Sequence, residues 1–224
     1  MPILHLVRHG QSTSNAAGTL AGRTPGVGLT SRGEQETRAL AEFVRGLDPA
    51  LIAVSPLQRC QETARLLAGT LDWPDDRLRT APGLQEVDYG RWAGASLKSL
   101  TAEPAWQQLR ADPAAFAFPG GETVEQMATR ARTAVEDLDD QVRRSSGEKA
   151  VWVAVSHGDI IQAVLAWALG MPLGRYRRIA VPPASISTVH LGPEPLVTLI
   201  GARPEFGTPA AQDPTGGPAR IGGA

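Results

Sequence analysis

The sequence has little cysteine, little net charge and no long apolar segment. Cys60 is the single cysteine, so an intramolecular disulfide cannot form. The 22 Lys and Arg residues nearly balance 23 Asp and Glu residues, which argues against nucleic acid or an anionic membrane as a partner. No run approaches the roughly 18 apolar residues of a membrane span, and the first ten residues lack a signal-peptide pattern. We therefore expect a cytoplasmic protein in which any anion site is a local cluster of positive charge.

What is present is the pattern of an α/β domain. Short apolar runs at residues 3–7, 51–54 and 150–155 predict buried strands. Between them, capped or amphipathic segments predict helices over about residues 30–45, 57–71, 122–144 and 159–169. This alternation predicts a three-layer α/β/α sandwich with a mostly parallel central sheet.

The remaining segments complete one domain over residues 1–202. Residues 11–28 read as a long loop, 79–81 as a short strand, and 185–191 with 196–200 as a closing strand pair. Residues 95–118 predict a small helical lid insertion. Residues 203–224 are rich in Gly, Pro and Ala, and we expect them to form a disordered tail.

Each of three predicted strands is followed by arginine or histidine. The first ends in Arg8-His9-Gly10, the second leads to Arg59 one turn into the next helix, and the third ends at His157-Gly158. Carboxyl ends of parallel strands share one edge of a sheet, so these side chains are expected to meet. Arginine forks and a helix N-terminus bind phosphate well. Each feature alone is weak, since Arg59 also fits a surface helix position, but together they predict a phosphate site.

The motifs around these residues resemble the histidine phosphatase superfamily, also called phosphoglycerate-mutase-like. They are Leu6-Val7-Arg8-His9-Gly10-Gln11-Ser12, Leu29-Thr30-Ser31-Arg32-Gly33, Ser55-Pro56-Leu57-Gln58-Arg59, Leu84-Gln85-Glu86, Pro119-Gly120-Gly121-Glu122 and Val155-Ser156-His157-Gly158. They stand in the family's order and cover about residues 3 to 200. As a set they are specific, whereas each one could arise by chance.

The resemblance implies a role for each matched residue. His9 would be the nucleophile, and its second ring nitrogen should then donate to a fixed acceptor. Glu86 would be the general acid and base, which requires a raised carboxyl pKa such as Trp92 and a phosphate dianion could cause, with Asp88 as a rival. The catalytic set would be His9, Glu86, His157, Arg8 and Arg59, and the phosphate-binding set Arg8, Ser12, Asn15, Gly22, Arg59, His157 and Gly158.

Three functions remain open. A phosphomonoester hydrolase passes the phosphoryl group of His9 to water, and a phosphomutase passes it to a second substrate hydroxyl. Val87 stands where the mutases of the family usually have Arg, and Lys98 is one residue out of register, which favours the hydrolase, although Arg91 or Arg110 could replace the lost cations. A non-catalytic phospholigand-binding protein is the third reading.

Other predictions concern partners and bystander residues. The resemblance implies a small phosphorylated substrate, no cofactor and no metal, and leaves a homodimer open. His5 shares strand parity with His9, but no Cys or carboxylate completes a ligand set, so we interpret His5 as packed or supporting and His190 as structural. Cys60 reads as a packing residue, although Arg59 could lower its pKa. Trp106 and Phe116 either line the pocket or form the core of the lid.

Overall fold

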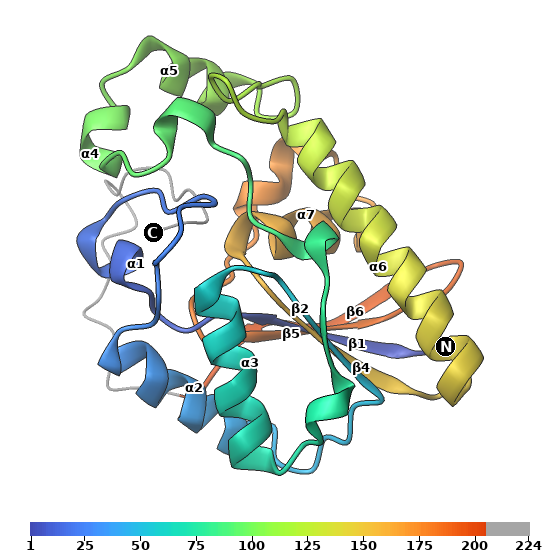
Figure 1. Cartoon of the computed structure of the whole chain (residues 1–224). Coiled ribbons are helices and arrows are strands. Elements are labelled where there is room, and N and C mark those ends of the chain that lie inside the picture. The colour runs from blue at the N-terminus through green and yellow to red at the C-terminus, as the bar shows by residue number, and fades with distance from the viewer. Residues whose placement is uncertain (205–224) are drawn as a thin grey trace.

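A computed structural model of the chain, described here for residues 1–204, is a three-layer α/β/α sandwich (Figure 1). Its six-stranded sheet has the order β3-β2-β4-β1-β5-β6. The strands are β1 (Ile3–Arg8), β2 (Leu51–Val54), β3 (Leu78–Thr80), β4 (Val151–Ser156), β5 (Ile186–His190) and β6 (Leu196–Ala202). Pairs β1–β4, β2–β4 and β2–β3 are parallel, while β1–β5 and β5–β6 are antiparallel. The predicted fold class is confirmed.

Helices cover both faces of the sheet. They are α1 (Thr13–Ala17), α2 (Ser31–Phe43), α3 (Gln58–Leu71), α4 (Leu97–Leu100), α5 (Pro104–Ala111), α6 (Val124–Ser146) and α7 (Gly158–Ala168), with short 3₁₀ turns η1 (Asp75–Arg77), η2 (Pro82–Leu84), η3 (Gly90–Trp92) and η4 (Leu173–Arg178). Alternation along the central strands separates two cores. Leu6 and Trp152 face the core with α6 and α7, and Val7 and Val153 face the core with α2 and α3. Both central strands are therefore buried on both sides, as their unbroken apolar sequence predicts.

The segment predicted as a loop over residues 11–28 contains a helix. Ser12 caps α1, since its hydroxyl accepts from the amide of Asn15 while the Asn15 side chain accepts from the Ser12 amide. This reciprocal capping stabilises a turn too short for a periodic apolar pattern. Gly18 then ends the helix in the left-handed conformation.

The lid has an aromatic core of its own. Trp92, Trp106, Phe116 and Phe118 are all buried, and their neighbouring ring centroids lie 5.1 to 5.9 Å apart. The Trp92 indole also donates to Glu103 at 3.0 Å. Of the two readings left open for Trp106 and Phe116, the lid core is the one observed.

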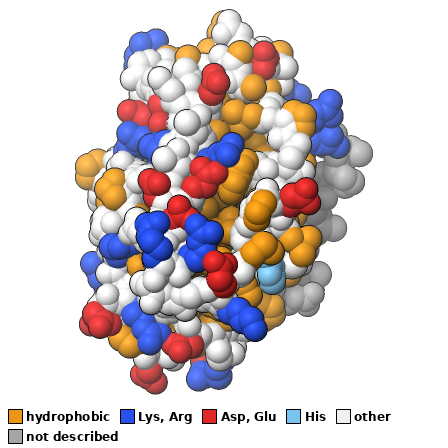
Figure 2. Space-filling model, turned by 90° about the vertical axis from the view of Figure 1, so that its right-hand side faces the viewer, with side chains coloured by type: hydrophobic (Ala, Val, Ile, Leu, Met, Phe, Trp, Pro, Cys, Tyr) orange, Lys and Arg blue, Asp and Glu red, His pale blue; other side chains and the backbone are white. Residues whose placement is uncertain are grey.

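The surface is mixed in charge. Figure 2 shows Lys and Arg interspersed with Asp and Glu, beside a band of hydrophobic side chains, as the near-zero net charge leads one to expect. Within residues 1–204, no helix combines the length and apolarity that a membrane span requires. The tail predicted over residues 203–224 lies outside the described residues from 205 onward.

The backbone of residues 88–91, shortly after Glu86, is in direct contact with the backbone of the Pro119–Gly121 turn. Asp88 O accepts from the amide of Glu122 at 3.0 Å, and Arg91 N donates to Pro119 O at 2.9 Å. A Cβ on Gly121 would overlap the carbonyl of Asp88, so this contact requires glycine.

We predict that Gly121→Ala destabilises the protein by about 1–3 kcal/mol, because either backbone must move to relieve the overlap. Gly69→Ala is the matched control, since a Cβ there meets nothing within 4 Å and the residue is helical. That control should be neutral or stabilising by about 0.5–1 kcal/mol. The urea unfolding midpoints of the two variants measure both changes in stability. Equal midpoints for Gly121→Ala and Gly69→Ala would contradict a tight backbone contact at Gly121.

Candidate active site

The ends of three adjacent parallel strands bring the predicted residues together. Arg8 ends β1 opposite Ser156, which ends β4, and the amide of His9 donates to Ser156 O at 3.1 Å. The rings of His9 and His157 consequently lie edge to face, with centroids 5.2 Å apart. Ser55 follows β2, and its backbone amide donates a hydrogen bond to Val155 O at 3.0 Å, which aligns that strand with β4. The shared sheet edge expected from the sequence is present.

Arg59 joins the two imidazoles. Its Nε donates to His9 Nε2 at 3.2 Å, and its Nη2 lies 3.1 Å from His157 Nδ1 and 2.9 Å from Gly22 O. The side chain is 1% exposed, although it starts in the first turn of α3. Its Nη1 is buried without a hydrogen-bond partner among the described residues. Arg59 is thus a buried guanidinium in the site, and the alternative of a surface arginine is wrong.

His9 has the hydrogen bond that the sequence analysis requires of a nucleophile. Its Nδ1 lies 2.7 Å from Gly10 O, and because a carbonyl only accepts, Nδ1 carries the proton. Nε2 therefore presents its lone pair to Arg59. Burial and the charges of Arg59 and Arg8 lower the pKa of His9 well below its usual value, so the ring is neutral.

His157 is also neutral and fixed at both nitrogens. Its Nε2 lies 2.7 Å from Ser55 Oγ, and because Arg59 can only donate, Nδ1 accepts and Nε2 carries the hydrogen. Burial and the Arg59 charge lower the pKa of His157 well below its usual value. Cys60 packs against this ring, and burial raises the pKa of its thiol to about 12 despite Arg59. The packing reading of Cys60 is correct.

Glu86 lies beside His157 and is 1% exposed. One carboxylate oxygen accepts from the Val87 amide at 3.0 Å, and the other is 3.9 Å from His157 Nδ1. Burial, followed by the negative charge of Asp159, raises the pKa of Glu86 to about 8. A neutral acid and a neutral imidazole therefore face each other, rather than an ion pair. The neighbour that raises the pKa is Asp159, which the sequence analysis does not single out.

The rival acid has a different environment. The Asp88 side chain is 45% exposed, accepts from the Gly90 amide at 3.0 Å and faces Arg23 at 3.8 Å. The Asp88 carboxylate is therefore half-exposed and caps a turn, whereas Glu86 is buried beside His157. The geometry favours Glu86.

Two arginines and one glutamate clamp the segment that bears Glu86. Arg23 donates to Glu86 O at 3.0 Å, and Arg130 donates to Gln85 O at 2.9 Å. Both arginines also bind Glu122, at 3.1 and 2.7 Å. The segment has no regular secondary structure at Glu86, so these bonds fix the backbone from which the acid projects.

The remaining predicted residues lie around this cluster in different roles. Arg8 is buried and donates to Val181 O at 2.7 Å, and Gly158 is buried as the first residue of α7. Gly22 directs its carbonyl at Arg59. Ser12 and Asn15 cap α1 by hydrogen bonds to each other. In one of these the Ser12 hydroxyl donates to Asn15 Oδ1 at 3.0 Å.

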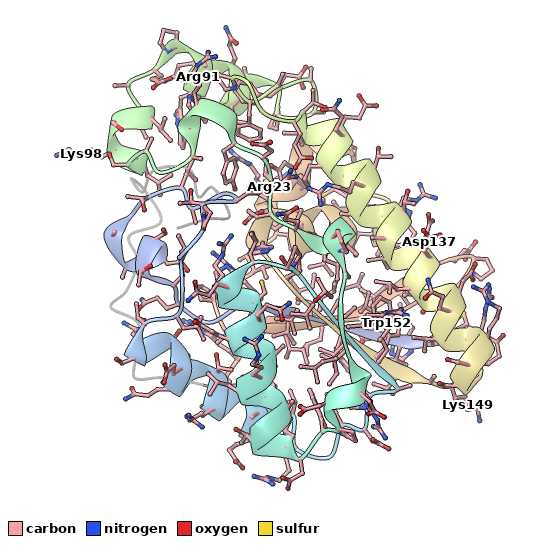
Figure 3. All side chains as sticks on the ribbon, in the orientation of Figure 1. Arg23, Arg91, Lys98, Asp137, Lys149 and Trp152 are labelled. Carbon is pink, nitrogen blue, oxygen red and sulfur yellow. The ribbon has the colours of Figure 1, made fainter. Side chains whose placement is uncertain are left out.

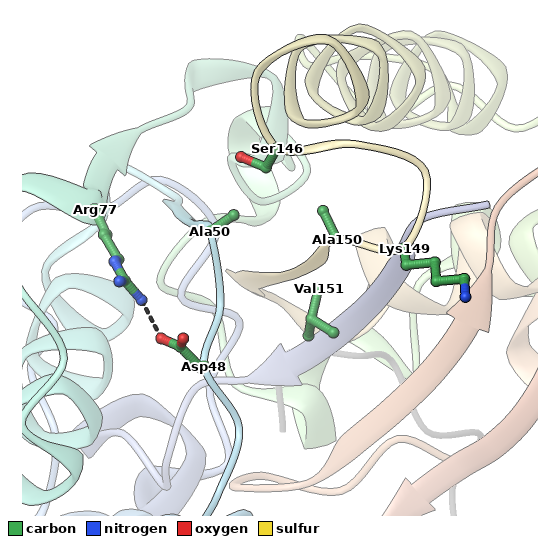
Figure 4. A pocket seen from close by; sticks show the side chains of 7 residues that line it. All are labelled: Asp48, Ala50, Arg77, Ser146, Lys149, Ala150 and Val151. Carbon is green, nitrogen blue, oxygen red and sulfur yellow. Dashed lines mark hydrogen bonds and ion pairs between the residues drawn. The ribbon is translucent and has the colours of Figure 1, made fainter.

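Two other regions differ in chemistry from this cluster. His5 Nδ1 pairs with Thr188 Oγ1 at 3.0 Å, which matches a packed residue. A hollow of about 480 Å³ lies where β2 and β4 begin, and there Arg77 pairs with Asp48 while Lys149 points away from both (Figure 4). Within residues 1–204, no three His, Cys, Asp or Glu side chains are grouped to hold a metal ion.

The sequence profile described as "Histidine phosphatase superfamily (branch 1)" matches residues 4–199. The chain belongs to the histidine phosphatase superfamily. Among curated proteins it is 29% identical over 194 residues to a probable phosphoglycerate mutase GpmB of Enterobacter sp. (strain 638), covering 86% of each chain. It is 31% identical over 188 residues to the probable GpmB of Erwinia tasmaniensis, covering 83% of each.

Solved structures of similar histidine phosphatases carry other names. "Mycobacterial hydrolase 1" is 26% identical with a TM-score of 0.78, covering 90% of this chain and 99% of that one. A mycobacterial glucosyl-3-phosphoglycerate phosphatase is 26% identical with a TM-score of 0.76 over 89% and 98% of the two chains. A phosphoserine phosphatase from Entamoeba histolytica, in complex with 3-phosphoglyceric acid, is 25% identical with a TM-score of 0.77 over 90% and 98%. The superfamily's phosphatases and its mutase-like proteins are both represented.

The raised pKa of Glu86 predicts how the unfolding free energy of this protein depends on pH. Between the ordinary carboxyl pKa and about 8, the unfolded chain releases this proton and the folded protein keeps it, so stability falls as pH rises through that window. Glu86→Gln removes this penalty. We expect its unfolding free energy to exceed that of the wild type by roughly a few kcal/mol at about pH 9, and by far less at about pH 5.

Thermal unfolding of Glu86→Gln and of the wild type across this pH range measures the difference. A Glu86→Gln curve that runs parallel to the wild type at every pH would contradict a buried neutral Glu86.

Proposed function

We propose that this chain is a phosphomonoester hydrolase that acts through a phosphohistidine on His9, with Glu86 as general acid and base. The observation that carries the proposal is the buried Arg59 guanidinium, which joins the nucleophilic nitrogen of His9 to His157 and keeps one donor nitrogen uncommitted. A small phosphorylated substrate is the ligand that this concentration of fixed donors suits.

In the first step, His9 Nε2 attacks phosphorus in line with the ester oxygen. The N–P bond forms, the P–O bond breaks, and the bonding pair passes to the leaving oxygen. Glu86 donates its proton to that oxygen, since its raised pKa keeps the acid protonated near neutral pH. The proton on Nδ1 stays with His9, held by Gly10 O.

In the second step, the Glu86 carboxylate removes a proton from water. The water oxygen attacks phosphorus, the N–P bond breaks, and its electron pair returns to Nε2. Phosphate leaves, and both His9 and Glu86 regain their starting protonation. Positive groups matter in both steps because charge on the transferring phosphoryl must be stabilised.

Phosphate oxygens have donors on several sides in this proposal. Arg59 turns from the His9 lone pair to the phosphoryl group, and Arg8 approaches from the end of β1. His157 contributes once a dianion draws a proton onto Nδ1, since a bound anion raises the pKa that the arginines lower. The same resemblance assigns supporting positions to Ser12, Asn15, Gly22 and Gly158.

A phosphoglycerate-type mutase is the second candidate, because curated relatives over most of the chain are named probable phosphoglycerate mutases. A mutase grips a substrate carboxylate with additional cations. Here Val87, which follows the acid, is fully buried and apolar, and Lys98 points outward at the edge of the lid (Figure 3). Arg23 lies nearer the acid but is paired with Glu122. These features support the hydrolase.

His9→Gln tests the nucleophile. We expect hydrolysis of a panel of phosphomonoesters to fall at least about a thousandfold, because no other group accepts the phosphoryl. His190→Gln, a histidine at the end of β5, is the matched control and should keep its rate. Quenching in alkaline denaturant should trap phosphohistidine, identified by its loss on treatment with acid, in the wild type and in His190→Gln but not in His9→Gln.

The same panel separates the three candidates. Vanadate-sensitive release of phosphate indicates a hydrolase, exchange of label within 3-phosphoglycerate indicates a mutase, and binding without turnover indicates a phospholigand-binding protein. A His9→Gln protein with the full wild-type rate would overturn the mechanism.

Glu86→Gln tests the general acid. Alkyl phosphates need a proton on the leaving oxygen, whereas 4-nitrophenyl phosphate does not, so we expect the former to slow by about 10²–10⁴ and the latter much less. Asp88→Asn should leave the ratio of the two rates unchanged. Equal slowing of both esters by Glu86→Gln would contradict its role, and a selective loss in Asp88→Asn would transfer that role to Asp88.

A further inference from the structure

The strand pairing of β1 stops just before the peptide that supports His9. The amide of His9 still donates to Ser156 O of β4 at 3.1 Å, but the amide of Gly10 lies beyond the last paired residues, Arg8 and Ser156. Gly10 is buried, and a buried amide without a hydrogen-bond partner is strongly disfavoured. The amide of Gly10 therefore needs an acceptor from outside the sheet.

That acceptor is the hydroxyl of Thr63, in the second turn of α3. The amide of Gly10 donates to Thr63 Oγ1 at 3.1 Å, and the same hydroxyl donates to Arg59 O at 2.7 Å. A hydroxyl has one proton and a carbonyl only accepts, so the proton lies toward Arg59 O and a lone pair faces Gly10. Thr63 is 0% exposed. One buried hydroxyl thus contacts the backbone of Arg59 and the residue that follows His9.

Helix α2, which packs beside α3 (Figure 1), encloses Gly10 from another side. A Cβ on Gly10 would lie 2.5 Å from Gly33 O and 2.6 Å from Thr37 Oγ1, so the backbone of Gly10 lies directly against α2. The carbonyl of the next residue, Gln11, accepts from the amide of Thr30 at 2.9 Å. The peptide between Gly10 and Gln11 is therefore fixed between the two helices.

The carbonyl of this peptide holds the proton of His9. Gly10 O accepts from His9 Nδ1 at 2.7 Å, which leaves Nε2 unprotonated beside Arg59 Nε at 3.2 Å. The tautomer of a neutral imidazole is set by the hydrogen bond that one of its nitrogens makes. With the proton on Nε2 instead, His9 would have no lone pair there for phosphorus. The orientation of Gly10 thus determines which nitrogen of His9 can attack.

We propose that Thr63 is a positioning residue for the nucleophile, because its hydroxyl fixes Gly10 in the orientation that keeps the proton of His9 on Nδ1. This inference rests on the proposed function, since it concerns the tautomer of the proposed nucleophile. Thr63 touches neither substrate nor the reacting atoms. It acts through Gly10, and its bond to Arg59 O also relates the strand that bears His9 to the helix that bears Arg59.

The bond from Thr63 to Arg59 O is by itself ordinary. A threonine in a helix commonly donates to the carbonyl four residues earlier. Thr70 on the same helix does so, to Leu66 O at 2.7 Å. The hydroxyl of Thr63 differs in that it also accepts from the amide of another segment. Thr70 is therefore a control that matches Thr63 in residue type, in helix and in helical bond.

Thr63→Val removes the hydroxyl and keeps the shape of the side chain. The buried amide of Gly10 loses its acceptor, so Gly10 turns and its carbonyl no longer fixes the ring of His9. We expect kcat/KM to fall about 10–100-fold, equally for alkyl phosphates and 4-nitrophenyl phosphate, because a misplaced nucleophile slows attack on both esters. The inhibition constant of inorganic phosphate should change less than about threefold, since the arginines of the site are unaltered.

Two further variants serve as controls for the rate. Thr63→Ser keeps the hydroxyl and should recover at least roughly a third of the wild-type kcat/KM. Thr70→Val removes a helical threonine bond of the same kind and should keep the wild-type rate. A loss of equal size in Thr63→Val and Thr70→Val would overturn the proposal, because it would trace the effect to the helix and not to Gly10.

The tautomer of His9 is a readout that needs no turnover. In protein with ¹⁵N-labelled histidine, two-bond proton–nitrogen correlations show which nitrogen of each imidazole carries the proton, and His9→Gln identifies the signals of His9. We expect the proton on Nδ1 in the wild type, Thr63→Ser and Thr70→Val, and a population with the proton on Nε2 in Thr63→Val. A merely structural role would lower the folded fraction and leave the tautomer of the folded protein unchanged.

The two readouts separate failure of this inference from failure of the proposed function. If the wild type hydrolyses no phosphomonoester but Thr63→Val shifts the tautomer, only the hydrolase proposal fails. If the wild type is active and Thr63→Val keeps either the wild-type tautomer or the full rate, the assignment of Thr63 fails, as it does if the wild type already has the proton of His9 on Nε2. If Thr63→Val does not fold, Thr63→Cys decides by the same two readouts, because a thiol is a weaker acceptor than a hydroxyl.

Discussion

The arrangement depends on one buried guanidinium. Arg59 lies between two neutral imidazoles at the carboxyl edge of a parallel sheet, with bonds of 3.2 and 3.1 Å to His9 and His157. A buried charge of this kind is unfavourable without compensation. Its partners come from three separate parts of the chain, so the site exists only when the sheet is correctly registered. In the proposed function, a bound phosphate dianion offsets this cost by replacing the lost solvation of Arg59.

The protonation of the site follows from that positive charge and from burial. Burial, followed by the charges of Arg59 and Arg8, lowers the pKa of both histidines and keeps them neutral, so Nε2 of His9 has a free lone pair. Glu86, which like Arg59 faces Nδ1 of His157, keeps its proton because burial and Asp159 outweigh the attraction of Arg59 and Arg8. The proposed transfer of a phosphoryl group to His9 requires this combination of a neutral imidazole and a neutral carboxylic acid in one pocket. Glu86 lowers stability at neutral pH, because there the unfolded chain releases a proton that the folded protein keeps.

The residues of the site come from both regular secondary structure and an irregular segment. His9, Arg8 and Arg59 stand on strand ends and a helix start, whose geometry the sheet determines. Glu86 projects from a segment without regular structure, whose carbonyls accept from Arg23 and Arg130, and Glu122 binds both arginines. The aromatic cluster of the neighbouring lid joins the core beneath the sheet, since the rings of Phe118 and Tyr89 have centroids 5.0 Å apart.

The sequence by itself determined the sandwich, the parallel central strands and the convergence of Arg8, His9, Arg59 and His157. Apolar runs alternating with amphipathic helices have few packings, and polar residues at the ends of parallel strands must share an edge. Motif order then singled out Glu86. The sequence pattern did not predict helix α1, because the reciprocal hydrogen bonds of Ser12 and Asn15 stabilise this short helix and it has no periodic apolar pattern.

Only the tertiary structure decided which groups lie behind the acid. Asp159, Tyr89 and Tyr176 come from a helix start, an irregular segment and a 3₁₀ turn, and no spacing rule relates them. An acidic residue in the apolar first turn of α7 was the one available signal, and it could equally have been an ordinary helix N-terminal charge. Protonation depends on distance and burial in three dimensions, so residue order cannot specify that Glu86 keeps its proton near neutral pH.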